Sequence, residues 1–123
     1  MKEPDLTTAT IDQLLERFVS MCLAQDKALD DDDIAAYNRL YQHTRAISDE
    51  LKRRGPEARL SLTKLYTHPN PQVRYKAATG SYGVAPEAAR AILQAIKDSK
   101  LPPQYLDAGM TLAALDDGTS MLD

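Results

Sequence analysis

Residues 56–78 read PEARLSLTKLYTHPNPQVRYKAA, and this stretch decides the fold class. Pro56 suits the first turn of a helix, where the backbone amides have no partner inside the helix. Pro69 and Pro71 end that helix, because a proline cannot donate in a helix interior and disfavours helical geometry in the residue before it. Asn70 is then a natural N-cap and Pro71 a natural first residue of the next helix. The stretch therefore predicts two helices joined by a short turn.

Two more helices are predicted ahead of this stretch. Thr10 and Gln13 have the spacing of a capping box, which predicts a helix from residue 10 to about Ala28. The acidic run 30–33 follows, and it lacks the alternating ligands and the glycine of an EF-hand loop. We interpret the run as a solvated turn whose last Asp caps a second, long helix. Gly55, preceded by three cationic side chains, ends that second helix.

The remaining helices are again marked by prolines. Pro86 opens a fifth helix, and Pro102 and Pro103 separate it from a sixth. No segment alternates between apolar and polar residues for long enough to form a strand. The connections are short, so consecutive helices should be antiparallel neighbours. The sequence therefore predicts an all-α fold of about six helices in three antiparallel hairpins.

A weak internal repeat with a spacing of 31 to 32 residues runs through the second half of the chain. In the first helix of each pair, Leu62 and Leu65 are matched by Leu93 and Ile96. In the second helix, the series Pro71, Val73, Ala77 and Ala78 is matched by Pro103, Tyr105, Gly109 and Met110. A period in this range is typical of helical solenoids, in which a hairpin buries its apolar face only against the next hairpin.

The turn between the paired helices resembles that of a known repeat family. Residues 68–74, HPNPQVR, followed by Ala77 and Ala78, resemble the inter-helix turn of HEAT repeats. In that family the turn usually carries an Asp that meets the Arg in a ladder between repeats. Here Arg74 matches the family pattern, while His68 and Asn70 stand at the acidic positions. The resemblance implies a HEAT/armadillo-like, right-handed α-α superhelix.

The whole chain, including the closing segment 107–112, also looks like a family of small bacterial proteins known only as a domain of unknown function with a HEAT-like fold. This resemblance implies a compact six-helix stack and a bacterial source. It brings no catalytic residues to transfer to this sequence.

Length and composition predict one domain over residues 1–123, with a frayed end over 1–9. The chain is 43% hydrophobic and 27% charged, which is ordinary for a globular protein. Cys22 has no second cysteine to pair with, and the polar N-terminus does not resemble a signal peptide. No run of apolar residues is long enough to span a bilayer. We therefore expect a cytoplasmic protein without a membrane partner.

Charge is distributed unevenly along the chain. Residues 1–38 carry a net charge of −6, residues 39–76 a net charge of +6 and residues 77–123 a net charge of −3. The basic block supplies a candidate partner-binding surface, which consists of Arg53, Arg54, Arg59, Arg74 and Lys76. Tyrosines are interleaved with these cations, a pattern that also suits nucleic-acid backbones. The alternative interpretation is a solvated face together with a helix C-cap.

Motifs for catalysis or for metal binding are absent. The two histidines, His43 and His68, lie in different elements without ligands at metal-binding spacing. Cys22 falls on the apolar stripe of the first helix, where a buried hydrophobe is expected. The segment 80–83, GSYG, lacks the strand and the Lys that a phosphate loop requires. We therefore predict no catalytic residues, no metal and no cofactor.

Three functions remain open at this point. The first is a non-catalytic protein–protein interaction module, in one version a small bacterial regulatory or toxin-neutralising protein. The second is nucleic-acid binding through the basic block 39–76. The third is an enzyme whose site is assembled from distant side chains, which would need a pocket with convergent polar groups. We predict the first function, a protein-binding module. The sequence does not identify its partner or its oligomeric state, and we predict that the protein is not an enzyme.

Overall fold

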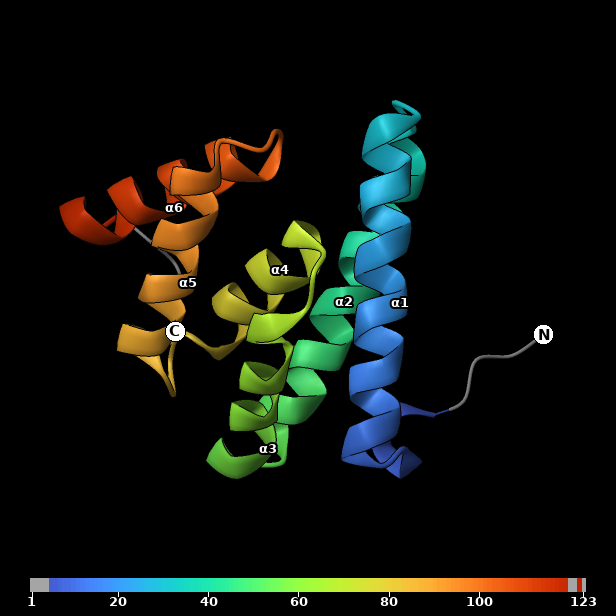
Figure 1. Cartoon of the computed structure of the whole chain (residues 1–123). Helices are drawn as coiled ribbons and strands as arrows, with labels where there is room; N and C mark the ends of the chain where they lie inside the picture. Colours follow the sequence, from blue (N-terminus) through green and yellow to red (C-terminus); the bar gives the residue numbers. More distant parts are fainter. Residues whose placement is uncertain (1–4, 120–121, 123) are drawn as a thin grey trace. The chain divides into compact units, whose positions relative to one another are not determined.

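The computed structural model describes residues 5–119 and residue 122. These residues form six α-helices and two 3-10 segments and contain no strand, which confirms the predicted all-α class (Figure 1). In chain order the elements are η1 (Leu6–Thr8), α1 (Ile11–Asp30), α2 (Ile34–Arg53), α3 (Pro56–Leu60), η2 (Ser61–Thr67), α4 (Pro71–Ser81), α5 (Pro86–Ser99) and α6 (Gln104–Asp117). The chain divides into two compact units, Met1–Ser61 and Leu62–Asp123.

The first unit is built on the hairpin of α1 and α2, which lie side by side in Figure 1. The predicted capping box is confirmed at the start of α1. The Gln13 amide N donates to Thr10 Oγ1 over 3.1 Å, and the Thr10 amide N donates to Gln13 Oε1 over 2.9 Å. At the start of α2, Asp33 Oδ1 accepts from the Ala36 amide N over 3.0 Å. The acidic run therefore turns the chain and caps α2, as predicted.

The core of the first unit lies along the apolar stripe of α1. Its buried residues include Leu14, Leu15, Phe18 and Cys22, and the expected burial of Cys22 is confirmed. On α2 the buried residues begin only at Thr44 and continue with Ile47 and Leu51. Apolar burial of this kind is the main source of stability for a helical hairpin.

Residues 5–9, which the sequence predicted to be frayed, form a capped 3-10 turn. Asp5 Oδ1 accepts from the Thr7 amide N over 2.9 Å, and Ala9 is buried. The rest of the segment predicted to fray, residues 1–4, lies outside the described residues. The turn is tethered by a long-range contact, because Arg54 Nη2 donates to the Leu6 carbonyl over 2.9 Å. Sequence reasoning has no access to a contact across 48 positions.

The helix predicted to open at Pro56 and to end before Pro69 is α-helical only as far as Leu60 and continues as the 3-10 segment η2. At the change, Ser61 Oγ donates to the Ala58 carbonyl over 2.5 Å. Serine hydroxyls often bond to a carbonyl of the preceding turn and compete there with the regular helix ladder. A 3-10 segment is also a frequent ending for a helix.

The second unit packs α4, α5 and α6 around one core. The core residues are Ala78, Ala89, Leu93, Ile96, Ala108 and Leu112. Asn70 caps α4 as predicted, since its Oδ1 accepts from the Gln72 and Val73 amides over 2.8 and 3.2 Å. Half of the core residues are alanines, and such small side chains allow helices to approach closely.

Buried polar pairs link the elements of the second unit. Gln104 Nε2 donates to Gln72 Oε1 over 3.0 Å, between the starts of α6 and α4. The hydroxyls of Tyr66 and Ser81 lie 2.5 Å apart, and Ser81 Oγ also donates to the Ala77 carbonyl over 2.7 Å. Burial raises the pKa of Tyr66, while the hydrogen bond with Ser81 opposes that rise. These pairs satisfy polar groups inside the core, where an unpaired one would be costly.

Candidate functional site

Arg53 and Arg54, two residues of the predicted binding surface, converge on Glu50 in the first unit. Arg53 contacts both carboxylate oxygens, with Nε 3.0 Å from Oε1 and Nη2 2.6 Å from Oε2. Arg54 Nε donates to Glu50 Oε2 over 2.7 Å. These bonds to Arg53 and Arg54 lower the pKa of the buried Glu50 carboxyl from 4.5 to about 2. The carboxylate therefore stays ionised at neutral pH and holds both guanidinium groups.

The two arginines differ in what they leave available to a partner. The Arg53 side chain is 62% exposed, so its outer edge faces solvent. Arg54 is largely buried and uses Nη2 to bind the Leu6 carbonyl, with the Thr7 carbonyl 3.3 Å away. Arg59, the third predicted residue in this unit, is buried in α3. Of these three cations, Arg53 is the one that projects into solvent.

Arg74 and Lys76, the other two predicted residues, lie on α4 in the second unit. Both are half-buried, and residues two positions apart on a helix do not share a face. The charge of Lys76 affects the pKa of Asp107 on α6. Burial raises the pKa of this carboxyl, and the Lys76 charge opposes the rise. Arg74 Nε is buried and has no hydrogen-bond partner within the described part of the chain. The pair therefore does not form one exposed basic cluster.

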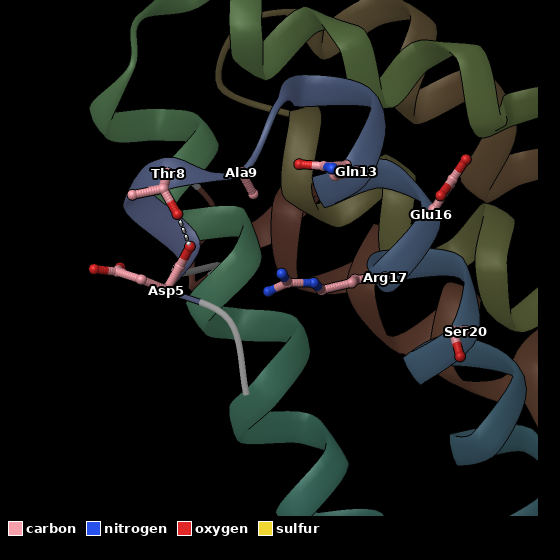
Figure 2. A pocket seen from close by; sticks show the side chains of 7 residues that line it. All are labelled: Asp5, Thr8, Ala9, Gln13, Glu16, Arg17 and Ser20. Atoms are coloured by element: carbon pink, nitrogen blue, oxygen red, sulfur yellow. Dashed lines mark hydrogen bonds between the residues drawn. The ribbon is translucent and has the colours of Figure 1, made fainter. Parts of the chain in front are cut away.

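A hollow of about 590 Å³ lies between the N-terminal turn and the first turns of α1 (Figure 2). Its lining residues are Asp5, Thr8, Ala9, Gln13, Glu16, Arg17 and Ser20. Much of this polarity serves local structure: Thr8 Oγ1 donates to the Asp5 carbonyl over 3.0 Å, and Gln13 belongs to the capping box. Hydrogen bonds from the Thr7 backbone and side chain lower the pKa of Asp5. Asp5 is therefore a poor proton donor near neutral pH.

The described residues contain no group of three or more His, Cys, Asp or Glu side chains placed to hold a metal ion. The two histidines occupy separate elements, and His68 Nδ1 accepts from the Asn70 amide N over 3.0 Å in the turn before α4. That bond gives His68 a role in the turn geometry. In the hollow on α1, Asp5, Thr8 and Gln13 serve helix caps and turns, whereas Glu16, Arg17 and Ser20 belong to the body of α1.

The outer face of α6 is apolar. Leu106 is 54% exposed and Met110 is 72% exposed, and Ala113 is also exposed. Spacings of four and three residues place these side chains on one face of the helix. We call Leu106, Met110 and Ala113 the α6 stripe. The Lys97 methylenes lie 3.8 Å from the position of a Cβ added to Gly109, so they border this face.

The sequence did not identify the α6 stripe as a surface. It placed Met110 in the sixth helix through the internal repeat, and the fully or nearly buried residues of that helix are Gln104, Ala108 and Leu112. Two sets of apolar residues follow the helical period on α6, and periodicity does not say which set faces inward. The only signal was the internal repeat, which pairs Met110 with Ala78.

Positions equivalent in the repeat have contrasting surroundings. Ala78 of α4 is fully buried in the core that α5 and α6 complete, while Met110 of α6, 32 positions later, faces solvent. Gln72 and Gln104 stand at the same spacing and bond to each other. Thus α6 is hydrogen-bonded to α4 through equivalent glutamines. The face of α6 that carries Met110 is exposed, although the equivalent face of α4, at Ala78, is covered.

A family model described as a domain of unknown function (DUF2019) matches residues 12–116, which include the whole α6 stripe. The chain belongs to this family. That membership confirms the predicted likeness to a small domain-of-unknown-function family. A search of the curated proteins found no match.

One solved structure resembles this DUF2019 chain along its whole length. It is the crystal structure of the protein RPA1889 from Rhodopseudomonas palustris CGA009, with 42% sequence identity and a TM-score of 0.93. The similarity covers 98% of this chain and 100% of RPA1889. None of the helices in the described part of the chain combines the length and hydropathy needed to span a bilayer.

Proposed function

We propose that this protein is a non-catalytic protein-binding module and that its binding face is the α6 stripe. The observation that carries the proposal is the exposure of Leu106 and Met110 next to each other on one helix face. Covering an exposed Leu or Met side chain is worth roughly 1.5–3 kcal/mol. Methionine also adapts its shape to a partner, because its unbranched side chain has several rotatable bonds. Scattered single apolar residues would not support this conclusion, but a contiguous stripe does.

The proposal includes a HEAT-like arrangement of the helices, a right-handed α-α superhelix. The repeat period and the bond between the equivalent residues Gln72 and Gln104 support it. Solenoids of this kind commonly bind proteins through the faces of their stacked helices. A bacterial, cytoplasmic setting belongs to the same proposal, and the 42% identity with a Rhodopseudomonas palustris protein supports the bacterial part.

The proposal is tested by a photo-crosslinking residue placed at Met110 of the full chain in living cells. We expect covalent adducts with protein at this position. The matched control is the same residue at Ala91, which is exposed on the neighbouring helix α5 and lies outside the α6 stripe. Adduct-free chains at position 110, or equal adduct yields at 110 and 91, would remove the proposal.

Nucleic-acid binding through the basic block 39–76 is the second candidate. The mostly exposed guanidinium of Arg53 favours it, while the burial of Arg54 and Arg59 weakens it. The test measures the fluorescence anisotropy of labelled DNA and RNA against the full chain at low ionic strength. Binding that falls steeply with salt and is reduced by Arg53→Glu would establish this function. We expect no such binding.

A further inference from the structure

We propose that the α6 stripe binds a second copy of this chain, with the two α6 helices antiparallel across a two-fold axis. This inference rests on the proposed function and names the partner of the same surface. It follows from three features of the second unit: the uncovered face of α6, the sizes of the side chains along α6 and the charges at the two ends of that helix.

The first feature is the uncovered face of α6. At Ala78 the outer face of α4 is fully covered by the core of the second unit, and at the equivalent Met110 the face of α6 is bare. A helix face that no neighbouring unit of a solenoid covers is usually polar. On α6 this face presents Leu106 and Met110 instead. A helix packed on this face would complete the pattern that α4 already shows.

The second feature is the alternation of large and small side chains along α6. A two-fold axis passing between Gly109 and Met110 sets Met110 of each copy over Gly109 of the other. The same axis sets Leu106 opposite Ala113 in both directions. Each large side chain therefore meets a small one, which is how closely packed helices interdigitate. The Lys97 methylenes beside Gly109 add apolar surface to the contact.

The third feature selects the antiparallel arrangement. Asp116 and Asp117 are exposed at the C-terminal end of α6, and the last turn of α6 holds no Lys or Arg. Arg90 of α5 pairs with Asp116, while Asp117 accepts hydrogen bonds from Thr119. Carboxylates at this end are disfavoured by the helix dipole, so a second cation beside Asp117 would be stabilising. Lys100 is exposed just before the N-terminal end of α6. Antiparallel pairing brings Lys100 of each copy to the acidic end of the other, whereas parallel pairing would put like charges together.

Such a contact is isologous, because the same patch serves both copies and the two-fold symmetry closes the assembly. The α6 stripes of both copies are then buried in the contact, and no further copy can bind to the same surface. The result is a discrete dimer, in which two copies are joined through their α6 helices.

The test is sedimentation equilibrium of the full chain over a wide concentration range. We expect a monomer–dimer equilibrium that shifts to monomer in Met110→Glu, with a dissociation constant raised about 100-fold or more, as for the loss of a central interface side chain. Ala91→Glu on α5 is the matched control and should leave the equilibrium unchanged. Circular dichroism and the Tm of both variants establish that each is folded.

A charge swap provides a second, independent readout. Lys100→Asp should weaken the dimer roughly tenfold, in the range of a rim charge pair. Adding Asp117→Lys to Lys100→Asp should restore dimerisation, because the two ends then carry exchanged charges that remain complementary. Restoration cannot be explained by damage to the fold, since the double variant carries more changes than the single one.

The inference is overturned if the chain is monomeric at all concentrations or if the dimer survives Met110→Glu. It is also overturned if the charge-swapped double variant stays as weak as Lys100→Asp. Failure here is distinguishable from failure of the proposed function. A monomeric chain that crosslinks from position 110 to a different protein would contradict the proposed self-association and would still support the proposed protein-binding function. A monomeric chain without crosslinks would sink both.

Discussion

The side-chain amide of Gln104 donates a hydrogen bond to Gln72 Oε1 over 3.0 Å, and both side chains are buried. Gln72 is the second residue of α4, and Gln104 is the first residue of α6. The bond therefore joins the starts of two helices that are equivalent in the internal repeat. Because a buried amide is costly to leave without its partner, the pair fixes the register of α6 against α4 in the second unit.

Replacing both members of this pair should cost less than the sum of the two single replacements. We expect Gln72→Leu or Gln104→Leu to lower the free energy of unfolding by about 1–3 kcal/mol, because each leaves the other amide buried without this bond. The double variant should lose less than the sum of the two single losses, with a coupling of roughly 0.5–3 kcal/mol. Urea unfolding followed by circular dichroism measures all three variants.

The matched control is Gln94→Leu, which removes an exposed glutamine on α5 whose Nε2 donates to Asp98 Oδ1 over 3.0 Å. Its effect should stay within about 0.5 kcal/mol, as is usual for surface positions. Strictly additive losses at positions 72 and 104 would show that the two glutamines act separately.

Local signals in the sequence were sufficient for the helices and their caps. Thr10 and Gln13, Asp33 and Asn70 all act within four positions of the amides they bind, so their roles follow from spacing alone. The roles of Arg54 and Met110 depend on contacts or coverage by distant parts of the chain. Composition and periodicity contain no information about such coverage, which is why the sequence alone does not show that Arg54 is covered and that Met110 is exposed.

The Glu50 carboxyl should make stability depend on pH in the acidic range. Its pKa is lowered from 4.5 to about 2 in the folded protein by bonds from Arg53 and Arg54. The stabilisation is therefore fully present above pH 4.5 and is lost as the pH falls through 4.5 toward 2. We expect Glu50→Gln to be less stable than the parent chain at pH 7, with a difference that shrinks as the pH approaches 2.

The measurement is the urea midpoint of both chains from pH 7 down to pH 2. The difference between the chains isolates Glu50 from the other carboxylates, which titrate in both. Asp49→Asn is the matched control, since Asp49 is an exposed neighbour on α2. A stability difference that stays constant across this range would contradict the assignment of the low pKa to Glu50.

Arg54 should hold the N-terminal turn in place. Its Nη2 binds the Leu6 carbonyl over 2.9 Å, and the backbone–backbone bonds of the turn are long, with the Ala9 amide N 3.3 Å from the Leu6 carbonyl oxygen. We expect Arg54→Met to raise the hydrogen-exchange rate of the Ala9 amide roughly tenfold, because local opening then competes with weaker bonds.

Arg53→Met provides the comparison for this prediction. It removes the other guanidinium from Glu50 but touches none of the carbonyls of residues 6–7 that Arg54 binds. Exchange at Ala9 should therefore stay near the rate of the parent chain. Equal acceleration in the two variants would mean that the turn responds to the charge around Glu50 and has no specific dependence on the Arg54 bond.

Truncation to alanine should destabilise the chain much more on the buried face of α6 than on its exposed face. Leu112→Ala removes a nearly fully buried side chain from the core of the second unit and should cost about 2–5 kcal/mol. Leu106→Ala removes an exposed side chain six positions earlier and should change the free energy of unfolding by no more than about 0.5 kcal/mol. Urea unfolding at a protein concentration too low for self-association keeps any intermolecular contact out of the comparison. A large loss of unfolding free energy for Leu106→Ala under these conditions would mean that the chain itself covers this face. The α6 stripe would then not be available to bind a partner.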